Sequence, residues 1–135
     1  MDSIELLKWF VATVNAEGTL HELKGKIFPD VAQEGTDNPC LVYQLVSSVG
    51  EPTVDEGPAR DGTLAYQIRI YGPSRKSANG LREAFRQKFE GMEPVAIGGG
   101  QIIEGSAWGE LADTFDPGTK DYGALGVIEF HLRKR

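Results

Sequence analysis

The sequence TLAYQIRIYGPS, at residues 63–74, decides how this chain folds. Every second residue from 64 to 70 is apolar, which is the period of a strand with one face on a core. Gly72 and Pro73 then end the strand, and Ser74 is a helix-capping residue directly before a run of helix formers. The stretch therefore predicts a half-buried strand that passes through a tight turn into a helix.

Two amphipathic helices follow from the spacing of apolar residues on either side of this stretch. One is expected from Ser74 to about Glu90, with a buried stripe formed by Ala78, Leu81, Phe85 and Phe89. The other is expected over residues 3–16, with a stripe formed by Ile4, Leu7, Val11 and Val14 and widened by Leu6 and Phe10.

Four main strands are expected, at residues 40–46, 63–71, 101–108 and 124–133. In the last one, alternate residues share an apolar face: Ala124, Gly126, Ile128, Phe130 and Leu132. Residues 95–97 are a candidate short strand, residues 27–29 are a short apolar step, and long glycine-rich, acidic connections span 49–62 and 109–123. We therefore predict one α+β domain over residues 1–135. It is a two-layer sandwich in which a mostly antiparallel four-stranded sheet carries two helices on one face, in the order α-β-β-α-β-β.

The charge is unevenly distributed along the chain. Twenty acids against 14 bases give a net charge of −6, which disfavours a general nucleic-acid binder. The acids gather on the two long connections, at Glu51, Asp55, Glu56 and Asp61 and again at Glu110, Asp113, Asp116 and Asp121. The bases gather between residues 69 and 88. These groups are either ordinary solvated loops and a solvated helix face, or surfaces that contact partners.

Few residues suggest chemistry. The single cysteine, Cys40, excludes an internal disulfide, and with only His21 and His131 a metal site of nitrogen and sulfur ligands is not expected. Gly98–Gly100 lacks the lysine and hydroxyl residue that a phosphate-binding loop requires. No apolar run approaches the ~20 residues of a membrane span. We expect no catalytic residue, cofactor, metal or membrane contact; an enzyme that uses Cys40 or His131 is the remote alternative.

Several segments together resemble one family. The apolar step Ile27–Pro29, the strand Pro39–Gln44, the strand end Gln67–Gly72 with its following helix, and the closing strand Tyr122–Phe130 occur in the order seen in that family. The chain resembles the tail-terminator and tail-completion proteins of long-tailed bacteriophages, which join the tail tube to the head. The likeness covers nearly the whole chain.

The resemblance implies a structural virion protein of the tail, assembled in the host cytoplasm as a ring of probable hexameric symmetry. Its partners would be the tail tube protein on one side and the head-neck connector protein on the other, with DNA passing through the lumen without specific binding. The eight acids above would then face the lumen or a partner ring. Contacts between subunits would fall to Arg75, Arg82, Arg86 and Trp108. The competing interpretation is a small dimeric α+β ligand-binding or adaptor domain that pairs through a sheet edge.

Overall fold

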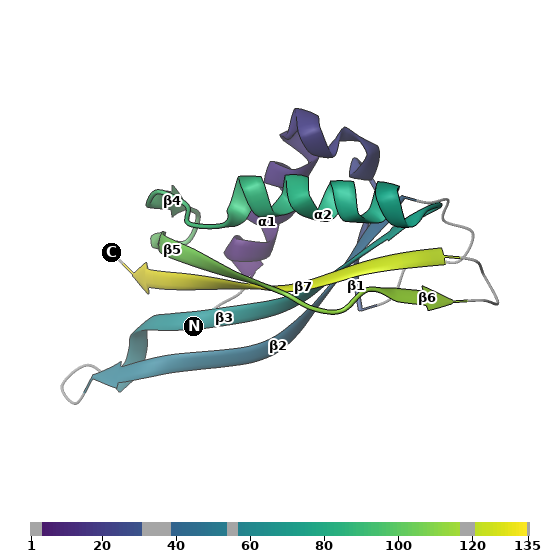
Figure 1. Cartoon of the computed structure of the whole chain (residues 1–135). Coiled ribbons are helices and arrows are strands. Elements are labelled where there is room, and N and C mark those ends of the chain that lie inside the picture. Colours follow the sequence, from purple (N-terminus) through teal and green to yellow (C-terminus); the bar gives the residue numbers. More distant parts are fainter. Residues whose placement is uncertain (1–3, 31–38, 54–56, 117–120, 135) are drawn as a thin grey trace.

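A curled seven-stranded sheet carries the helices on one of its faces (Figure 1). The computed structural model describes residues 4–30, 39–53, 57–116 and 121–134, and of residues 49–53, 57–61, 116, 121 and 134 it describes the backbone alone. The elements are α1 (Ile4–Ala16), the 3-10 helix η1 (Gly18–Leu23), β1 (Ile27–Pro29), β2 (Cys40–Thr53), β3 (Gly57–Gly72), α2 (Arg75–Phe89), β4 (Val95–Ile97), β5 (Gln101–Glu110), β6 (Thr114–Asp116) and β7 (Asp121–Lys134).

The sheet corrects the predicted four-stranded antiparallel architecture, which is wrong. Its strand order is β1-β2-β3-β7-β5-β4, and β6 pairs with β7 beyond the end of β5. The β1 strand runs parallel to β2, so the sheet is mixed, while the other pairs are antiparallel. With η1 between α1 and β1, the element order also differs from the predicted α-β-β-α-β-β.

The three short strands β1, β4 and β6 each pair with a longer neighbour. β4 confirms the candidate strand at residues 95–97, whereas β1 and β6 were not predicted as strands. In β1, Ile27 lies opposite Leu41, and the segment ends at Pro29 on the rim of the sheet, where a missing N–H costs no ladder bond. Three residues carry too little periodicity to identify a strand from sequence. Whether such a segment pairs as a strand depends on how the rest of the fold positions it beside a longer strand.

The connection predicted over residues 49–62 is mostly strand as well. The β2–β3 ladder continues through Val49–Thr63, Gly50–Gly62 and Glu51–Asp61, so β2 and β3 form one long hairpin. The sequence did not indicate this hairpin because the segment is rich in glycines and acids, which are depleted in strands. The ladder contains register shifts after Leu45 and after Glu51.

The core lies between the helices and the inner face of the sheet. Aromatic rings from both layers meet there: the Phe85 and Phe89 centroids are 4.5 Å apart, and the Phe10 and Phe89 centroids are 5.4 Å apart. Trp9 contacts Phe130 of β7 edge to face at 5.9 Å. Such contacts add about 0.5–1.5 kcal/mol each beyond the burial of area.

The stripe predicted for the second helix is confirmed, because the buried residues of α2 are Ala78, Leu81, Phe85 and Phe89. The predicted face of β7 is confirmed too, since residues 124, 126, 128, 130 and 132 are buried. The face of α1 is rotated from the prediction: Leu6, Phe10 and Val14 are buried, while Ile4 is 57% exposed. No helix in the described part of the chain is both long and apolar enough to cross a bilayer.

Candidate interaction surfaces

The outer edge of β2 is open along much of its length. β1 covers only Leu41–Tyr43, and none of the other described strands pairs with this edge. Every residue from Gln44 to Ser48 is exposed, whichever face of the strand it lies on. Leu45 is 46% and Val46 51% exposed, and the register shift at Val46 is a bulge that leaves this side chain outside the ladder. An edge with unpaired N–H and C=O groups and apolar side chains is a template for another strand.

The opposite edge is formed by β5 and its continuation β6. β4 covers Gln101–Ile103, and the Gly91 amide donates to the Ser106 carbonyl at 3.2 Å. Past Ser106 no described strand pairs with this edge. It too bears large exposed apolar side chains, at Leu111 and Phe115.

Phe115 belongs to a small aromatic platform at the end of β6. Its ring stacks on that of Tyr122, with centroids 4.6 Å apart. The guanidinium of Arg75, at the start of α2, lies 6.0 Å from the Tyr122 ring centre. Arg75, one of the predicted inter-subunit residues, is thus an exposed base that makes a cation–π contact with Tyr122.

Arg82 fixes the kink between β5 and β6. Its Nη1 lies 2.8 Å from Asp113 Oδ1 and donates at 3.2 Å to the carbonyls of Leu111 and Leu125. The Arg82 side chain is 13% exposed and that of Asp113 30%. The structure thus pairs a predicted inter-subunit base with a predicted lumen acid inside one chain. Their roles in contacts with other chains remain predictions.

Arg86 is also paired within its own helix. Its guanidinium contacts the carboxylates of Glu83 and Glu90, the latter at 3.0 Å. The hydrogen bonds from Arg86, and then the one from Gln87, lower the pKa of Glu83 to about 2, and the same carboxylates raise the pKa of Arg86. This is a network on the exposed face of α2, and an acid from another chain would have to compete with it.

Trp108 packs mainly inside the chain. Its ring lies 5.4 Å from Phe85, and a Cβ at Gly126 would overlap the indole. The indole nitrogen is buried and has no hydrogen-bond partner among the described residues. The role of Trp108 as an interface anchor remains a prediction, and the structure gives it a core role.

The two acidic stretches lie at opposite ends of the sheet (Figure 1). In the register, Glu51 faces Asp61 near the end of the β2–β3 hairpin, and Asp61 faces Arg133 near the end of β7. Asp116 and Asp121 face one another where β7 begins. Glu110 is exposed at the end of β5, whereas Asp55 and Glu56 lie outside the described residues. The structure therefore separates two groups of acids that the sequence alone could not place.

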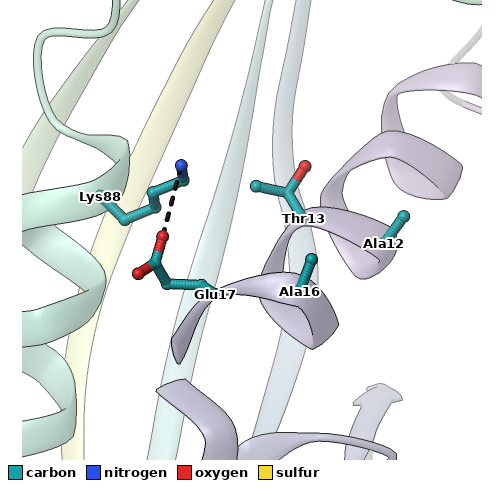
Figure 2. A pocket seen from close by; sticks show the side chains of 5 residues that line it. All are labelled: Ala12, Thr13, Ala16, Glu17 and Lys88. Atoms are coloured by element: carbon teal, nitrogen blue, oxygen red, sulfur yellow. Dashed lines mark ion pairs between the residues drawn. The ribbon is translucent and has the colours of Figure 1, made fainter. Parts of the chain in front are cut away.

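A shallow hollow of about 270 Å³ lies between α1 and α2. Figure 2 shows Glu17 and Lys88 pointing toward each other across it, with Lys88 Nζ 3.4 Å from Glu17 Oε2. The pKa of Glu17 is lowered, first by a hydrogen bond from the Thr19 amide and then by Lys88. Small side chains make up the rest of the lining, at Ala12, Thr13 and Ala16. This hollow links the two helices through an ion pair.

A larger hollow of about 460 Å³ lies between η1 and the start of α2, and His21, Ser74 and Lys76 are among its lining residues. Ser74 Oγ accepts from the Ser77 amide at 3.1 Å, and His21 Nδ1 lies 3.0 Å from the Gly18 carbonyl. Both groups are thus engaged locally.

The other candidates for chemistry are dispersed. His131 Nδ1 lies 3.0 Å from Thr63 Oγ1 on the sheet, far along the chain from His21, and Cys40 is buried at the start of β2. No cluster of three or more histidine, cysteine and acidic side chains that could hold a metal occurs among the described residues. Cys40 pairs with Tyr71 and His131 with Thr63, which lies eight residues away along β3, so the sheet holds these two groups apart.

Solved structures with the fold of this chain are known. A chain of the virion of a native gene transfer agent particle superposes with a TM-score of 0.61 at 13% identity, covering 91% of each chain. Another solved structure superposes with a TM-score of 0.63 at 12% identity, covering 97% of this chain and 92% of that one. No model of a known protein family matches the chain, and no curated protein matches it. The fold of this chain therefore occurs, over nearly its whole length, in a phage-like particle.

The exposed apolar residues of the two edges are not among the predicted site residues. The predicted strand over residues 40–46 contains Leu45 and Val46, and the predicted connection over residues 109–123 contains Leu111 and Phe115. A signal was present: two successive apolar residues followed by Ser47 and Ser48 break the period of two, as a bulge does.

Proposed function

We propose that this chain is a structural subunit of a phage-like virion, and that copies of it form a ring at the head-proximal end of the tail tube. The ring would end polymerisation of the tube and join the tail to the head. The structural match to a chain of a gene transfer agent virion, over 91% of each chain, is the observation that supports the virion role. The resemblance of its segments to tail terminators supports the narrower assignment.

The two-ended distribution of charge supports a subunit that joins two different structures. One acidic group lies near the tip of the β2–β3 hairpin and the other around the β6–β7 turn, at opposite ends of the long strands. If these strands run roughly along the ring axis, one group faces the tail tube protein and the other the head-neck connector protein. Acidic walls would also let DNA pass without being held.

The proposal assigns binding rather than catalysis to the chain. A ring subunit acts through its surfaces and needs no cofactor. The side chains that could take part in catalysis lie apart: His21 is close to the Gly18 carbonyl, His131 is close to Thr63, and Cys40 is buried. The virion is the expected location, and no partner of the ring is a membrane.

The direct test is deletion of the gene from the genome that encodes the particle, followed by electron microscopy. We expect tubes of irregular, extended length and filled heads without tails. Normal tails attached to heads would refute the proposal. Tubes of normal length that fail to attach would refute the terminator role in favour of a neck role.

A charge reversal tests the acidic end. Asp116→Lys together with Asp121→Lys, which leaves the Arg82–Asp113 pair intact, is supplied in trans to the deletion and is expected to reduce the number of joined, infectious or DNA-transferring particles. Glu93→Lys, at an exposed acid outside both groups, is the matched control and should restore joining. Equal rescue by both would show that the acids around the β6–β7 turn do not act in docking.

A further inference from the structure

The two open edges of the sheet are complementary in several respects. Each has main-chain groups that no described strand pairs with, and each has two large exposed apolar side chains: Leu45 and Val46 on β2, Leu111 and Phe115 on the β5–β6 edge. Monomeric proteins protect such edges with charges, prolines or covering segments. Here β1 and β4 each cover only three residues of the neighbouring long strand.

The strand directions allow these edges to pair with each other. β2, β3, β7 and β5 are antiparallel in succession, so β2 and β5 run in opposite directions. If the β2 edge of one copy meets the β5 edge of the next copy in the same orientation, the new pair is antiparallel as well. Antiparallel pairing is the more stable ladder, and repetition of the four strands preserves it from copy to copy.

The open parts of the two edges also lie at the same height. Ser47 pairs with Ala65, Ala65 with Glu129, and Glu129 with Ala107. Ser47 and Ala107 are therefore the two ends of one row across the sheet, and both are exposed. Copies related by a rotation about an axis parallel to the strands would bring these two ends together without a shift along the axis.

We propose that copies of this chain associate head to tail, with the β2 edge at Gln44–Ser48 of one copy against the β5 edge at Ala107–Gly109 of the next. This inference rests on the proposed ring and names the surfaces that build it. Such a contact is heterologous: each copy uses two different edges, so it closes into a ring when the rotation between copies closes. In this register Leu45 lies level with Trp108 of the next copy and Gln44 with Gly109, so the contact covers the exposed Leu45 and Val46.

The test uses the full chain and two edge variants. Val46→Lys alters only the β2 edge, Ala107→Lys alters only the β5 edge, and Ala12→Lys adds the same charge at an exposed site on α1. Molar mass is measured by light scattering after size exclusion, over concentrations up to about 1 mM. Circular dichroism verifies folding, and Leu45→Lys and Gly109→Lys replace a variant that does not fold.

Each edge variant alone is expected to raise the apparent dissociation constant by about tenfold or more, while Ala12→Lys assembles like the wild type. An equimolar mixture of the two edge variants should form dimers and nothing larger, because one intact edge of each kind remains. A wild type that stays monomeric throughout overturns the inference. So does an Ala107→Lys protein that assembles normally while Val46→Lys does not, which is the pattern of a dimer through two β2 edges. These outcomes are independent of the deletion experiment, which tests the role in the tail without reference to which edges meet.

Discussion

Replacing Gly126 with alanine should destabilise the folded chain, whereas the same change at a strand glycine with free space around its Cα would not. Gly126 lies on the inner face of β7, and a Cβ there would overlap the ring of Trp108. The indole also packs on Phe85, with ring centroids 5.4 Å apart, so moving it away from residue 126 would disturb this core contact. Glycine at 126 thus makes room for a ring that crosses from β5.

Two opposing effects determine how much Gly126→Ala changes the free energy of unfolding. The backbone of Gly126 is not in the left-handed region, so alanine gains about 0.5–1 kcal/mol through the unfolded state. Overpacking against the indole costs about 1–3 kcal/mol. We expect a net loss of about 1–2 kcal/mol in the free energy of unfolding. In a Trp108→Leu background the overlap disappears, so the same change should become neutral or favourable, with a coupling of about 2 kcal/mol.

Urea unfolding followed by far-ultraviolet circular dichroism measures all four corners of this cycle. Gly109→Ala is the matched control, since a Cβ at Gly109 in β5 would meet nothing within 4 Å. It should leave stability unchanged or raise it slightly. A Gly126→Ala protein as stable as the wild type would refute the packing argument, as would a destabilisation that persists in full after Trp108→Leu.

Three further outcomes follow from local contacts. Arg82→Gln should lower the free energy of unfolding by about 1–2 kcal/mol, because the shorter, uncharged side chain cannot reach Asp113 and the Leu111 carbonyl as the guanidinium does; a urea titration measures this loss, and an unchanged midpoint would contradict it. Ser74→Ala should cost about 1 kcal/mol in the same assay through the lost N-cap, whereas Ser48→Ala on the open edge should cost little. Glu83 has a folded-state pKa of about 2, below its ordinary 4.5, so its stabilising contribution is present above pH 4.5 and is lost as pH falls toward 2. Nuclear magnetic resonance titration should find that low pKa, and Arg86→Gln should return it toward 4.5; a Glu83 that titrates normally in the wild type would disprove the pairing.

Amphipathic patterns predicted the faces that meet in the core. The stripe of α2 and the alternating face of β7 depend only on which side chains leave water, and periodicity records that directly. The same reasoning failed at α1, where six apolar residues form too broad a stripe to fix the rotation. Leu6 and Phe10 face the core and Ile4 faces solvent because the helix must fit the aromatic residues of α2 and β7.

Strand number could not be obtained in the same way. β1 and β6, which were not predicted, are each three residues long, and the ladder that defines them depends on the partner strand as much as on their own residues. β4 is as short, but residues 95–97 were a candidate strand. The long β2–β3 hairpin was concealed for a different reason. Glycines and acids have low strand propensity, and the main-chain pairing of Gly50 with Gly62 overrides it.

The candidate site shows the same division between composition and geometry. Sequence located the charged groups, but their charges gave no indication of which were already paired: Arg82 has its acid at Asp113, and Arg86 has Glu83 and Glu90. Ion pairs inside the chain leave less electrostatic attraction for a neighbour, and exposed pairs contribute only about 0–1 kcal/mol. Open main-chain edges with apolar side chains offer more, because each ladder bond and each buried methyl adds to the contact. Association between copies should therefore depend on Leu45, Val46 and Ala107 more than on the arginines that the sequence singled out.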